Sequence, residues 1–388
     1  MTMSASPSHH PAMVRRKRSA RFIEIASAAG VSISTVNRVL NERGSVSAET
    51  RARVVAAAKQ LGVPRVLPDP RHGLTRFDVI LAASPTPYFS RLELALQRSA
   101  QMLDARIVIH RHRVDAADEH ALMQAIGQPR HRRDGLMVAL HDSARVREAL
   151  RAQRERGIPV VTLMSAIGAA SEIDGLRYAG IDNRRAGRSA GHFIGRMTLG
   201  SATHAPAVAG RVLLLTHRLS FRAHAERIDG CRSLLAERHP QLQTGEPVEC
   251  LDDPDRCQIA VQQALQASRR DGVPLLAIYH SGAGTAGVAR ALQQAGGMLG
   301  RRIVWVGHEL SDDHRRWLRE DLLDLVIDQD PDGQIVAGLH HLLHACGYVD
   351  QAPRDEPNDF RLFCGENLRD LPPYLDGPLN APLEKIVR

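Results

Sequence analysis

The sequence predicts a small all-α head followed by a two-lobed α/β body with parallel, doubly wound sheets. Three observations support this prediction. The chain has 388 residues, which is too long for one average domain. Its beginning is basic with short helical patterns, and the rest alternates short apolar runs with helical patterns. We expect a disordered basic N-terminus (1–18), a helical head (19–64), a linker (65–75), the body (76–368) and an irregular C-terminal tail (369–388).

The excess positive charge of the chain is confined to its beginning. Residues 1–65 hold eleven Lys and Arg against three Asp and Glu, so they carry the whole formal net charge of +8. A basic head on a neutral body indicates binding to the phosphates of nucleic acid. Aromatic residues make up 4% of the sequence, which disfavours recognition by base stacking. A basic tail that serves solubility alone is the alternative.

The compartment is expected to be the cytoplasm. The first twenty residues are polar, and the sequence shows neither a signal-peptide pattern nor an apolar run long enough to span a membrane. The five cysteines form no CxxC pair. Reduced, buried thiols in a reducing compartment are therefore expected, with no membrane partner.

The pattern of the head predicts three short helices. A helix over 22–29 is followed by Gly30, which tolerates the positive φ of a tight turn between helices. Ser32 is placed to cap a second helix that ends at Leu40, and Ser47 is placed to cap a third that runs through Leu61. Two short helices joined by such a turn are typical of a helix-turn-helix.

The second helix of a helix-turn-helix enters the major groove of DNA. Here its buried side is expected to carry Val36, Val39 and Leu40. On the other side, Arg38 suits guanine, Asn37 suits adenine, and an isoleucine suits a thymine methyl group. A small helical hairpin with solvated polar residues is the alternative. The expected DNA contacts are Ser32, Ile33, Ser34, Thr35, Asn37, Arg38, Arg51 and Leu67.

The runs IASAAGVSISTVNRVLN (25–41) and VSAETRARV (46–54) resemble the head of LacI/GalR transcriptional regulators across residues 21–62. The resemblance implies a sequence-specific regulator, a repressor, bound to a pseudo-palindromic operator. The linker departs from the family pattern, because Pro68 and Pro70 each disrupt a helix interior. Whether a hinge helix forms there and inserts Leu67 into the minor groove therefore stays open.

The body alternates apolar runs with helical patterns, as βαβ units do. Eight such units exceed one comfortable sheet, so we expect two lobes, with a ligand site where strand ends face each other. The expected strands are 78–83, 106–110, 134–139, 160–163, 211–215, 275–279, 303–306 and 325–327. The expected helices include 91–103, 145–156, 184–197, 223–238, 256–269 and 285–295.

The stretches RDGLMV (133–138), GIPVV (157–161) and AGIDNRRAG (179–187) make the body resemble the periplasmic-binding-protein-like type I core of the same regulators. The resemblance implies a small-molecule effector: a sugar, a polyol or a related metabolite. Guanidinium and carboxylate groups pair with neighbouring hydroxyls. The implied effector contacts are Tyr88, Phe89, Asp182, Asn183, Arg222, Arg227, Ser281, Glu309 and Gln329, the last in the final crossover between the lobes.

Several of these side chains have structural alternatives. Arg227 is able to brace its helix against Glu226 or Asp229, Tyr88 is able to be a core residue with a satisfied hydroxyl, and Glu309 is able to be structural. Two departures from the family, Ser281-Gly282 and Met164-Ser165, disfavour the familiar pentoses and hexoses as ligands. Four histidines near the expected site suit a carboxylate or a phosphate instead: His217, His224, His280 and His308.

Two other function classes compete with a regulator. Gly282, Gly284 and Gly287 form a GxGxxG run between a strand and a helix, the formal pattern of an NAD-binding enzyme. The run lies late in the chain, past five earlier strands, which disfavours this reading. A secreted solute-binding protein for transport has the right body, but the DNA-binding head argues against it. We expect no enzymatic activity and no cofactor.

A metal site is also disfavoured. His340 and His344 share a helix face, yet no HExxH arrangement accompanies them, and His110 and His112 lie two apart on a strand. Solvated histidines are expected at all of these positions, together with His341.

The expected assembly is a homodimer. One helix-turn-helix covers few base pairs, so such heads pair on half-sites with two-fold symmetry. Some relatives form tetramers through a C-terminal helix with repeating leucines. The stretch 370–382 has four prolines and a glycine and is unable to form that helix.

Overall fold

The computed structural model describes residues 22–41, 46–63, 74–115, 118–168, 172–199, 209–296 and 302–369. These residues form two compact units: one holds the helical head together with residues 74–76 and 103–108, and the other holds the rest of the α/β body. The expected disordered N-terminus, the irregular tail, Leu67 and the two linker prolines lie outside the described residues. In the described part of the chain, no helix is both long and apolar enough to cross a membrane.

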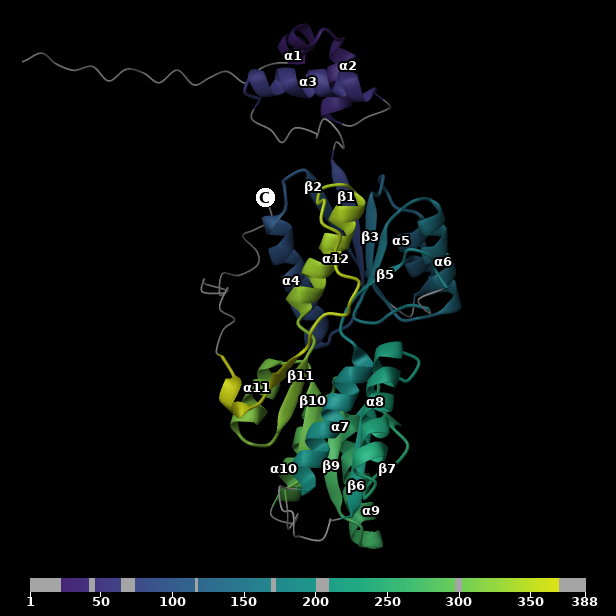
Figure 1. Ribbon diagram of the computed structural model, residues 1–388, viewed down its shortest axis with the longest axis vertical. Helices are drawn as coiled ribbons and strands as arrows, with labels where there is room; N and C mark the ends of the chain where they lie inside the picture. Colours follow the sequence, from purple (N-terminus) through teal and green to yellow (C-terminus); the bar gives the residue numbers. More distant parts are fainter. Residues whose placement is uncertain are drawn as a thin grey trace, which may run out of the picture. The chain divides into compact units, whose positions relative to one another are not determined.

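The head consists of α1 (Phe22–Ala29), α2 (Ile33–Leu40) and α3 (Ala48–Gln60), as its sequence predicts (Figure 1). The Ser32 hydroxyl accepts a hydrogen bond from the Thr35 amide at 3.1 Å and begins α2. The Ser47 hydroxyl begins α3 in the same way, with the Thr50 amide at 3.3 Å. Apolar side chains of all three helices pack into one small core around Ile25.

The first lobe of the body, here called the N-lobe, contains a five-stranded sheet in the order β2-β1-β3-β4-β5. Helices α5 and α6 cover one face of this sheet through a shared apolar cluster, and α4 and α12 lie on the other (Figure 1). The elements are β1 (Thr75–Ala82), α4 (Pro87–Met102), β2 (Ile107–Val114), α5 (Glu119–Gly127), β3 (Gly135–Ala139), α6 (Ala144–Glu155), β4 (Val160–Leu163), β5 (Arg177–Ala179) and α12 (Pro331–Ala345).

The second lobe, the C-lobe, contains a sheet in the order β12-β11-β10-β9-β6-β7, with β8 also paired to β6. Its strand pairs are parallel except that β12 runs antiparallel to β11. The elements are α7 (Asn183–Leu199), β6 (Gly210–Thr216), α8 (Arg222–Arg238), β7 (Leu242–Thr244), β8 (Val248–Glu249), α9 (Pro254–Asp271), β9 (Leu275–His280), α10 (Thr285–Ala295), β10 (Val304–His308), α11 (Asp312–Arg319), β11 (Leu325–Asp328) and β12 (Arg361–Phe363).

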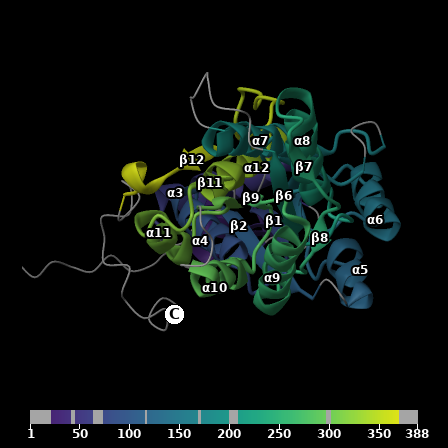
Figure 2. The same cartoon turned by 90° about the horizontal axis from the view of Figure 1, so that it is seen from below.

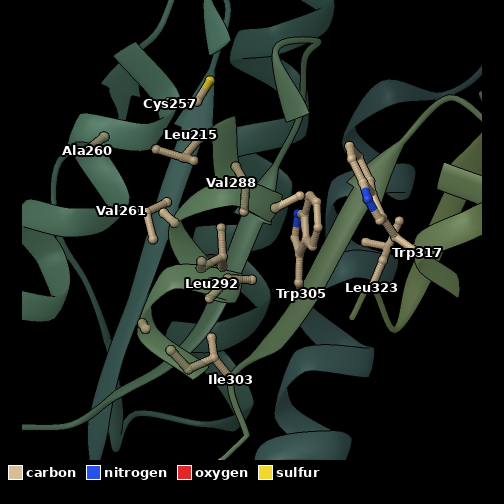
Figure 3. Packing of buried hydrophobic residues seen from close by; sticks show 14 of the residues in the cluster. Leu215, Cys257, Ala260, Val261, Val288, Leu292, Ile303, Trp305, Trp317 and Leu323 are labelled. Carbon is tan, nitrogen blue, oxygen red and sulfur yellow. The ribbon is translucent and has the colours of Figure 1, made fainter. Parts of the chain in front are cut away.

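Helices cover both faces of the C-lobe sheet. Because neighbouring side chains of a strand point to opposite faces, the side chains of β9, β10 and β11 are all buried. Val304 and Val306 pack against α7 and α8, which lie side by side (Figure 2). Trp305, between them, packs with α9, α10 and α11 on the other face. Figure 3 shows Trp305 beside Trp317, with their ring centroids 5.4 Å apart. These buried runs explain why the strands appear in the sequence as continuous apolar stretches.

The predicted two-lobed, doubly wound architecture is confirmed, and each of the eight predicted strands is present. Four strands were not predicted: β5, β7, β8 and β12 have only two or three residues each, too few for a periodic pattern. The thiols differ from the expectation in part. Cys231, Cys250 and Cys257 are buried, whereas Cys346 and Cys364 are partly exposed.

The chain crosses between the lobes three times, after β5, after β11 and after α12. The first and third crossings touch each other, because Ile181 forms a parallel bridge with Asn358. The Asn358 amide donates to the Gly180 carbonyl at 2.8 Å. Gln329 lies in the second crossing, so its predicted position in the last one was wrong. The third crossing was missed because it leads to the short strand β12.

Candidate functional site

A cavity of about 520 Å³ lies between the N-lobe and the C-lobe. Its wall is formed by residues that follow β1, β3 and β4 in one lobe and β6, β8, β9, β10 and β11 in the other. Open α/β sheets bind ligands at the carboxyl ends of their strands, where the chain turns away from the sheet. The volume is in the range of small-molecule sites, about 300–1,000 Å³.

Backbone strain is concentrated at this cavity. Six non-glycine residues of the described chain have positive φ, and four of them line the cavity: Met164, Leu251, Asp252 and Glu309. Such a conformation costs a non-glycine residue about 1–3 kcal/mol and persists only where the surrounding structure imposes it. Met164 and Glu309, at φ of 65° and 66°, each follow the end of a strand. The cavity therefore has the strained backbone that is typical of functional sites.

Arg227, on α8, supplies a fixed guanidinium group to the cavity wall. Its Nε donates to Asn183 Oδ1 at 2.8 Å, and its Nη1 donates to the Ser281 carbonyl at 2.9 Å. No described residue accepts a hydrogen bond from Nη2, so this group remains available to a ligand. The structure does not show Arg227 bracing its helix, because Glu226 pairs with Arg222 and Asp229 pairs with Arg184.

Two glycines bring Arg227 and Asn183 together. A Cβ atom on Gly187 of α7 would lie 1.9 Å from the Arg227 carbonyl oxygen, and one on Gly230 of α8 would lie 2.1 Å from the Arg184 carbonyl oxygen. Neither position accepts a side chain without moving a backbone. The two helices therefore pack at backbone contact, which lets the short Asn183 side chain reach the guanidinium group.

Glu309, directly after β10, places a carboxyl group in the cavity. Its Oε1 accepts a hydrogen bond from Gln329 Nε2. Its Oε2 is buried and has no partner among the described residues. Burial, together with the nearby Asp328 carboxylate, raises the pKa of Glu309 to about 7. The group is therefore partly protonated at neutral pH and has an oxygen free to pair with a ligand hydroxyl.

Tyr88 and Phe89, at the start of α4, form an aromatic wall. Their rings meet edge to face, with centroids 5.8 Å apart. The Tyr88 ring is buried against the cavity and its hydroxyl donates to Gln334 Oε1 at 2.9 Å. Burial, together with Glu309, raises the pKa of Tyr88, so the hydroxyl stays protonated. The ring thus lines the cavity while the hydroxyl is satisfied within the protein, and the contact of Tyr88 with an effector stays a prediction.

Three of the histidines that line the cavity, His224, His308 and His314, are buried and have lowered pKa values, so they are neutral. Burial and the charge of Arg227 lower the pKa of His224 to about 3 and that of His308 well below its usual value. Burial lowers the pKa of His314 to about 4. His280, which lies behind the wall rather than on it, has a pKa lowered to about 4 by burial. These imidazoles accept and donate hydrogen bonds but supply no positive charge.

The head presents a second surface of interest on α2. Val36, Val39 and Leu40 are buried, while Ile33 keeps 49% of its surface exposed and Arg38 is exposed beside Thr35. An exposed isoleucine with polar neighbours on a short helix suits contact with base edges. The other predicted DNA contacts within the described ranges are also accessible: Ser32 and Ser34 are exposed, and Thr35, Asn37 and Arg51 are partly exposed.

Two family models match the chain. One, for the periplasmic binding protein domain, matches residues 77–346, and one for bacterial regulatory proteins of the lacI family matches residues 22–63. This chain belongs to the LacI family of regulators. The regulator is thus a DNA-binding transcription factor with a small-molecule effector domain, as its sequence predicts. No curated protein matches it significantly.

The body of the regulator is similar in fold to solute-binding proteins of ABC transporters. One from Burkholderia graminis, in complex with D-arabinose, has 20% identity and a TM-score of 0.64, with 76% of this chain and 97% of that chain covered. One from Bacillus halodurans with bound myo-inositol has 15% identity and a TM-score of 0.64, covering 76% and 96%. One from Agrobacterium vitis with bound D-fucose has 16% identity and a TM-score of 0.64, covering 75% and 96%.

Six of the nine predicted effector contacts of the regulator line the cavity, and three do not. Asp182 instead caps α7, with the Arg185 amide at 2.8 Å. Asn183 lies behind the wall and holds Arg227. Arg222 turns toward Glu226 and toward the Gly168 carbonyl. The six on the wall are Tyr88, Phe89, Arg227, Ser281, Glu309 and Gln329.

Several wall residues were missed by the sequence analysis. Phe221 and His141 contribute rings, 6.0 Å apart, from opposite lobes. Asp252 accepts hydrogen bonds from the Ala283 amide and lies 3.3 Å from His217. Burial opposes ionisation of Asp252, but the His217 interaction outweighs it and keeps the pKa of this carboxyl low. The only available signal was position, since His141 follows a predicted strand end.

The GxGxxG run joins β9 to α10, and the residues from Ser281 to Ala286 form part of the cavity wall. Its glycines serve packing: a Cβ on Gly287 would lie 1.7 Å from the Pro254 carbonyl oxygen, and one on Gly284 would lie 2.9 Å from Asp252. Throughout the described ranges, no group of three or more His, Cys, Asp or Glu side chains is arranged to hold a metal ion.

Proposed function

We propose that this regulator is a repressor that binds a pseudo-palindromic operator as a homodimer and responds to a neutral, polyhydroxylated effector in the cavity between its lobes. The observation that carries the proposal is that Arg227 and Glu309 line the same cavity, each with a polar atom that no described residue satisfies. A guanidinium group donates hydrogen bonds to hydroxyls and a carboxyl group accepts hydrogen bonds from them, so the two groups together bind neighbouring hydroxyls.

The charges around the cavity support a neutral ligand rather than an anion. Arg227 is opposed by the carboxyl groups of Asp252, Glu309 and Asp313, which line the same cavity. The cavity histidines with lowered pKa add no positive charge. A carboxylate or phosphate ligand, which the number of histidines suggested, would thus meet three carboxyl groups, one of them partly protonated, beside the single guanidinium group of Arg227. Tyr88 and Phe89 offer aromatic faces for the apolar side of a sugar ring.

The similarity to sugar-binding proteins points the same way. The three solved structures named above hold D-arabinose, myo-inositol and D-fucose, which are all neutral polyols. A solute-binding protein for transport is the alternative function for such a body, but the regulator carries a helix-turn-helix that matches the lacI family. We propose no enzymatic activity for it.

A combined ligand and DNA assay tests the proposal. The full chain is screened by thermal shift against D-arabinose, D-fucose, D-allose and myo-inositol, with gluconate and glucose 6-phosphate as anionic comparisons. A compound that binds the folded state raises the melting temperature in proportion to ln(1 + [L]/Kd). Binding to a DNA site selected from a random library is then measured with and without each hit. We expect a neutral polyol to raise the melting temperature and to change DNA affinity.

Glu309→Ala is the matched variant for this assay. It is expected to remain folded and to bind the selected DNA, while the polyol loses its effect. Hits among the anions only would refute the neutral effector, and a polyol that stabilises the protein without changing DNA affinity would favour the solute-binding function. A normal polyol response in Glu309→Ala would remove this carboxyl group from the site.

A further inference from the structure

A second cavity, of about 270 Å³, lies in the N-lobe and shares no lining residue with the effector cavity. It lies at the amino ends of β4 and β5, the opposite edge of the sheet from the effector cavity. The last turns of α6 and α12 and the loop that follows α12 complete its wall. None of its lining residues belongs to the effector cavity or to the DNA-binding head.

Arg154, in the last turn of α6, presents a fixed guanidinium group to this cavity. Its Nε donates to the Asp174 carbonyl at 3.1 Å, and its Nη1 donates to the Ile158 carbonyl at 3.0 Å. Both acceptors are uncharged. Within the described ranges, Arg154 makes no ion pair, and Nη2 makes no hydrogen bond. The positive charge of Arg154 therefore has no carboxylate partner, and a planar guanidinium group is suited to bind an oxyanion.

Gly175 makes room for this guanidinium group. Its φ is +68°, and a Cβ atom at this position would lie 2.1 Å from Arg154 Nη2. Any residue with a side chain would therefore be strained and would also displace the guanidinium group. The glycine therefore leaves the space that Nη2 occupies.

A second arginine and two histidines complete the polar part of the wall. Arg177 pairs with Asp355 at 2.6 Å, but the side chains are 48% and 73% exposed, and such pairs contribute little. Arg177 is thus able to turn toward a ligand at small cost. His341 and His344 lie one turn apart on α12. Burial, followed by the charge of Arg177, lowers the pKa of His341, which therefore acts as a neutral hydrogen-bond donor.

The rest of the cavity wall is apolar and suits the apolar part of a small ligand. It consists of Pro159, Val160, Val161, Ala345, Ala352 and Pro353. The cavity thus combines two guanidinium groups and two imidazoles against one carboxylate, on an apolar floor. A planar guanidinium group matches the spacing of two oxygens of a phosphate or carboxylate. The volume, just below the usual range for drug-sized ligands, suits a small metabolite.

We propose that this cavity is a second ligand site, selective for a small organic oxyanion such as a phosphorylated or carboxylated metabolite. Arg154 and Arg177 bind the anionic group, and His341 and His344 donate further hydrogen bonds. The effector cavity takes a neutral ligand by contrast, so the two sites differ in the charge of what they bind.

Titration calorimetry of the full chain tests the site, with inorganic phosphate and acetate as separate probes at constant ionic strength. The variants are Arg154→Gln and His344→Gln. Arg151→Gln is the matched control, because Arg151 lies one turn earlier on α6 and also donates to a carbonyl, that of Glu172, but does not line the cavity. We expect saturable binding of one probe to the wild type and to Arg151→Gln, with Kd at least tenfold higher in both cavity variants.

The two probes distinguish a phosphoryl group from a carboxylate as the preferred anion. The absence of saturable binding of either probe would overturn the proposal, as would unchanged affinity in Arg154→Gln. His344→Gln keeps the test decisive should Arg154→Gln fail to fold, since the His344 side chain makes no hydrogen bond within the described ranges. The response to neutral polyols is expected to be unchanged in these variants, so this result is independent of the effector proposal.

Discussion

Arg227 Nε donates to Asn183 Oδ1 at 2.8 Å, from α8 to the first residue of α7. Asn183 in turn donates through Nδ2 to the Tyr178 hydroxyl at 3.2 Å and lies 3.5 Å from the Met164 carbonyl. The guanidinium group in the effector cavity is thus tied to the first crossing between the lobes. Asn183 does not line the cavity, so it acts on a ligand only by positioning Arg227.

Asn183→Ala is expected to weaken binding of the polyol found in the screen by at least tenfold. The variant leaves a buried arginine donor without its acceptor, which also costs about 1–3 kcal/mol of stability. Calorimetric affinity is compared with that of Asp182→Ala, which loses the cap of α7, about 1 kcal/mol, but no contact with Arg227. Asn183→Asp retains the acceptor oxygen and is expected to recover part of the affinity. Equal affinity in Asn183→Ala and Asp182→Ala would show that Asn183 does not position Arg227.

Glu309→Gln is expected to change how stability depends on pH. A carboxyl group with a pKa of about 7 in the folded state, against about 4.5 unfolded, takes up a proton on folding between these values. The contribution of Glu309 to the stability of the wild type therefore falls as pH rises through this window, by up to about 3 kcal/mol. The variant lacks this loss.

Urea denaturation at pH 5 and pH 8 measures the effect. The free energy of unfolding of Glu309→Gln, relative to the wild type, is expected to rise with pH. The buried histidines have the opposite dependence, since their lowered pKa values cost stability in acid, but they are present in both proteins and cancel in the difference. A pH-independent difference would mean that Glu309 is ionised at neutral pH like an ordinary glutamate.

Arg38→Ala is expected to lose affinity for the selected operator by about 1–3 kcal/mol, the cost of one lost base contact. Binding to random DNA, which depends on phosphates, is expected to change much less. Lys59→Ala, in the last turn of α3, removes one exposed positive charge and serves as the control. Fluorescence anisotropy titrations at several salt concentrations measure both affinities. Equal losses on operator and random DNA would exclude base recognition by Arg38.

Arg222→Ala is expected to loosen the contact between the lobes. Arg222 Nη1, in the C-lobe, donates to the Gly168 carbonyl of the N-lobe at 2.7 Å. The next residue, Ala223, donates its amide to Ser165 Oγ at 3.3 Å, so an N-lobe hydroxyl serves the first turn of α8, whose own N-cap residue Phe221 has no side-chain hydrogen bond. The contact between the lobes thus supplies a hydrogen-bond acceptor for the first turn of α8.

Hydrogen exchange at the first turn of α8 tests this contact. The Ala223 amide is expected to exchange several-fold faster in Arg222→Ala. Arg184→Ala, which removes an ion pair to Asp229 within the C-lobe, is expected to leave this amide unchanged. The same exchange rate in both variants would show that Arg222 does not hold the lobes together.

Light scattering at micromolar concentration is expected to give a mass near twice the 42.6 kDa of one chain. The reason is that paired half-sites with two-fold symmetry require two heads. A mass near one chain would contradict the half-site argument. A mass near four chains would show that a surface other than a C-terminal leucine helix forms tetramers.

The fold of this regulator was predictable because local patterns report local structure. Ser32 and Ser47 precede their helices as caps, and β4 and α10 have the predicted bounds, because capping and periodicity depend on neighbours in sequence. The position of the effector site also followed, since parallel strands end at one edge of a sheet. Ser281 and Glu309, which the family resemblance implied as effector contacts, both follow strand ends and line the cavity.

Which side chains meet was decided by the tertiary structure alone. Arg227 and Asn183 are 44 positions apart and meet because Gly187 and Gly230 allow α7 and α8 to pack at backbone contact. Asp182, beside Asn183, caps a helix instead, and no local pattern distinguishes the two roles. The second cavity gathers residues from Arg154 to Asp355, which only the folded chain brings together. Composition and periodicity record how buried each residue is, whereas the partner of a buried polar group depends on the path of the whole chain.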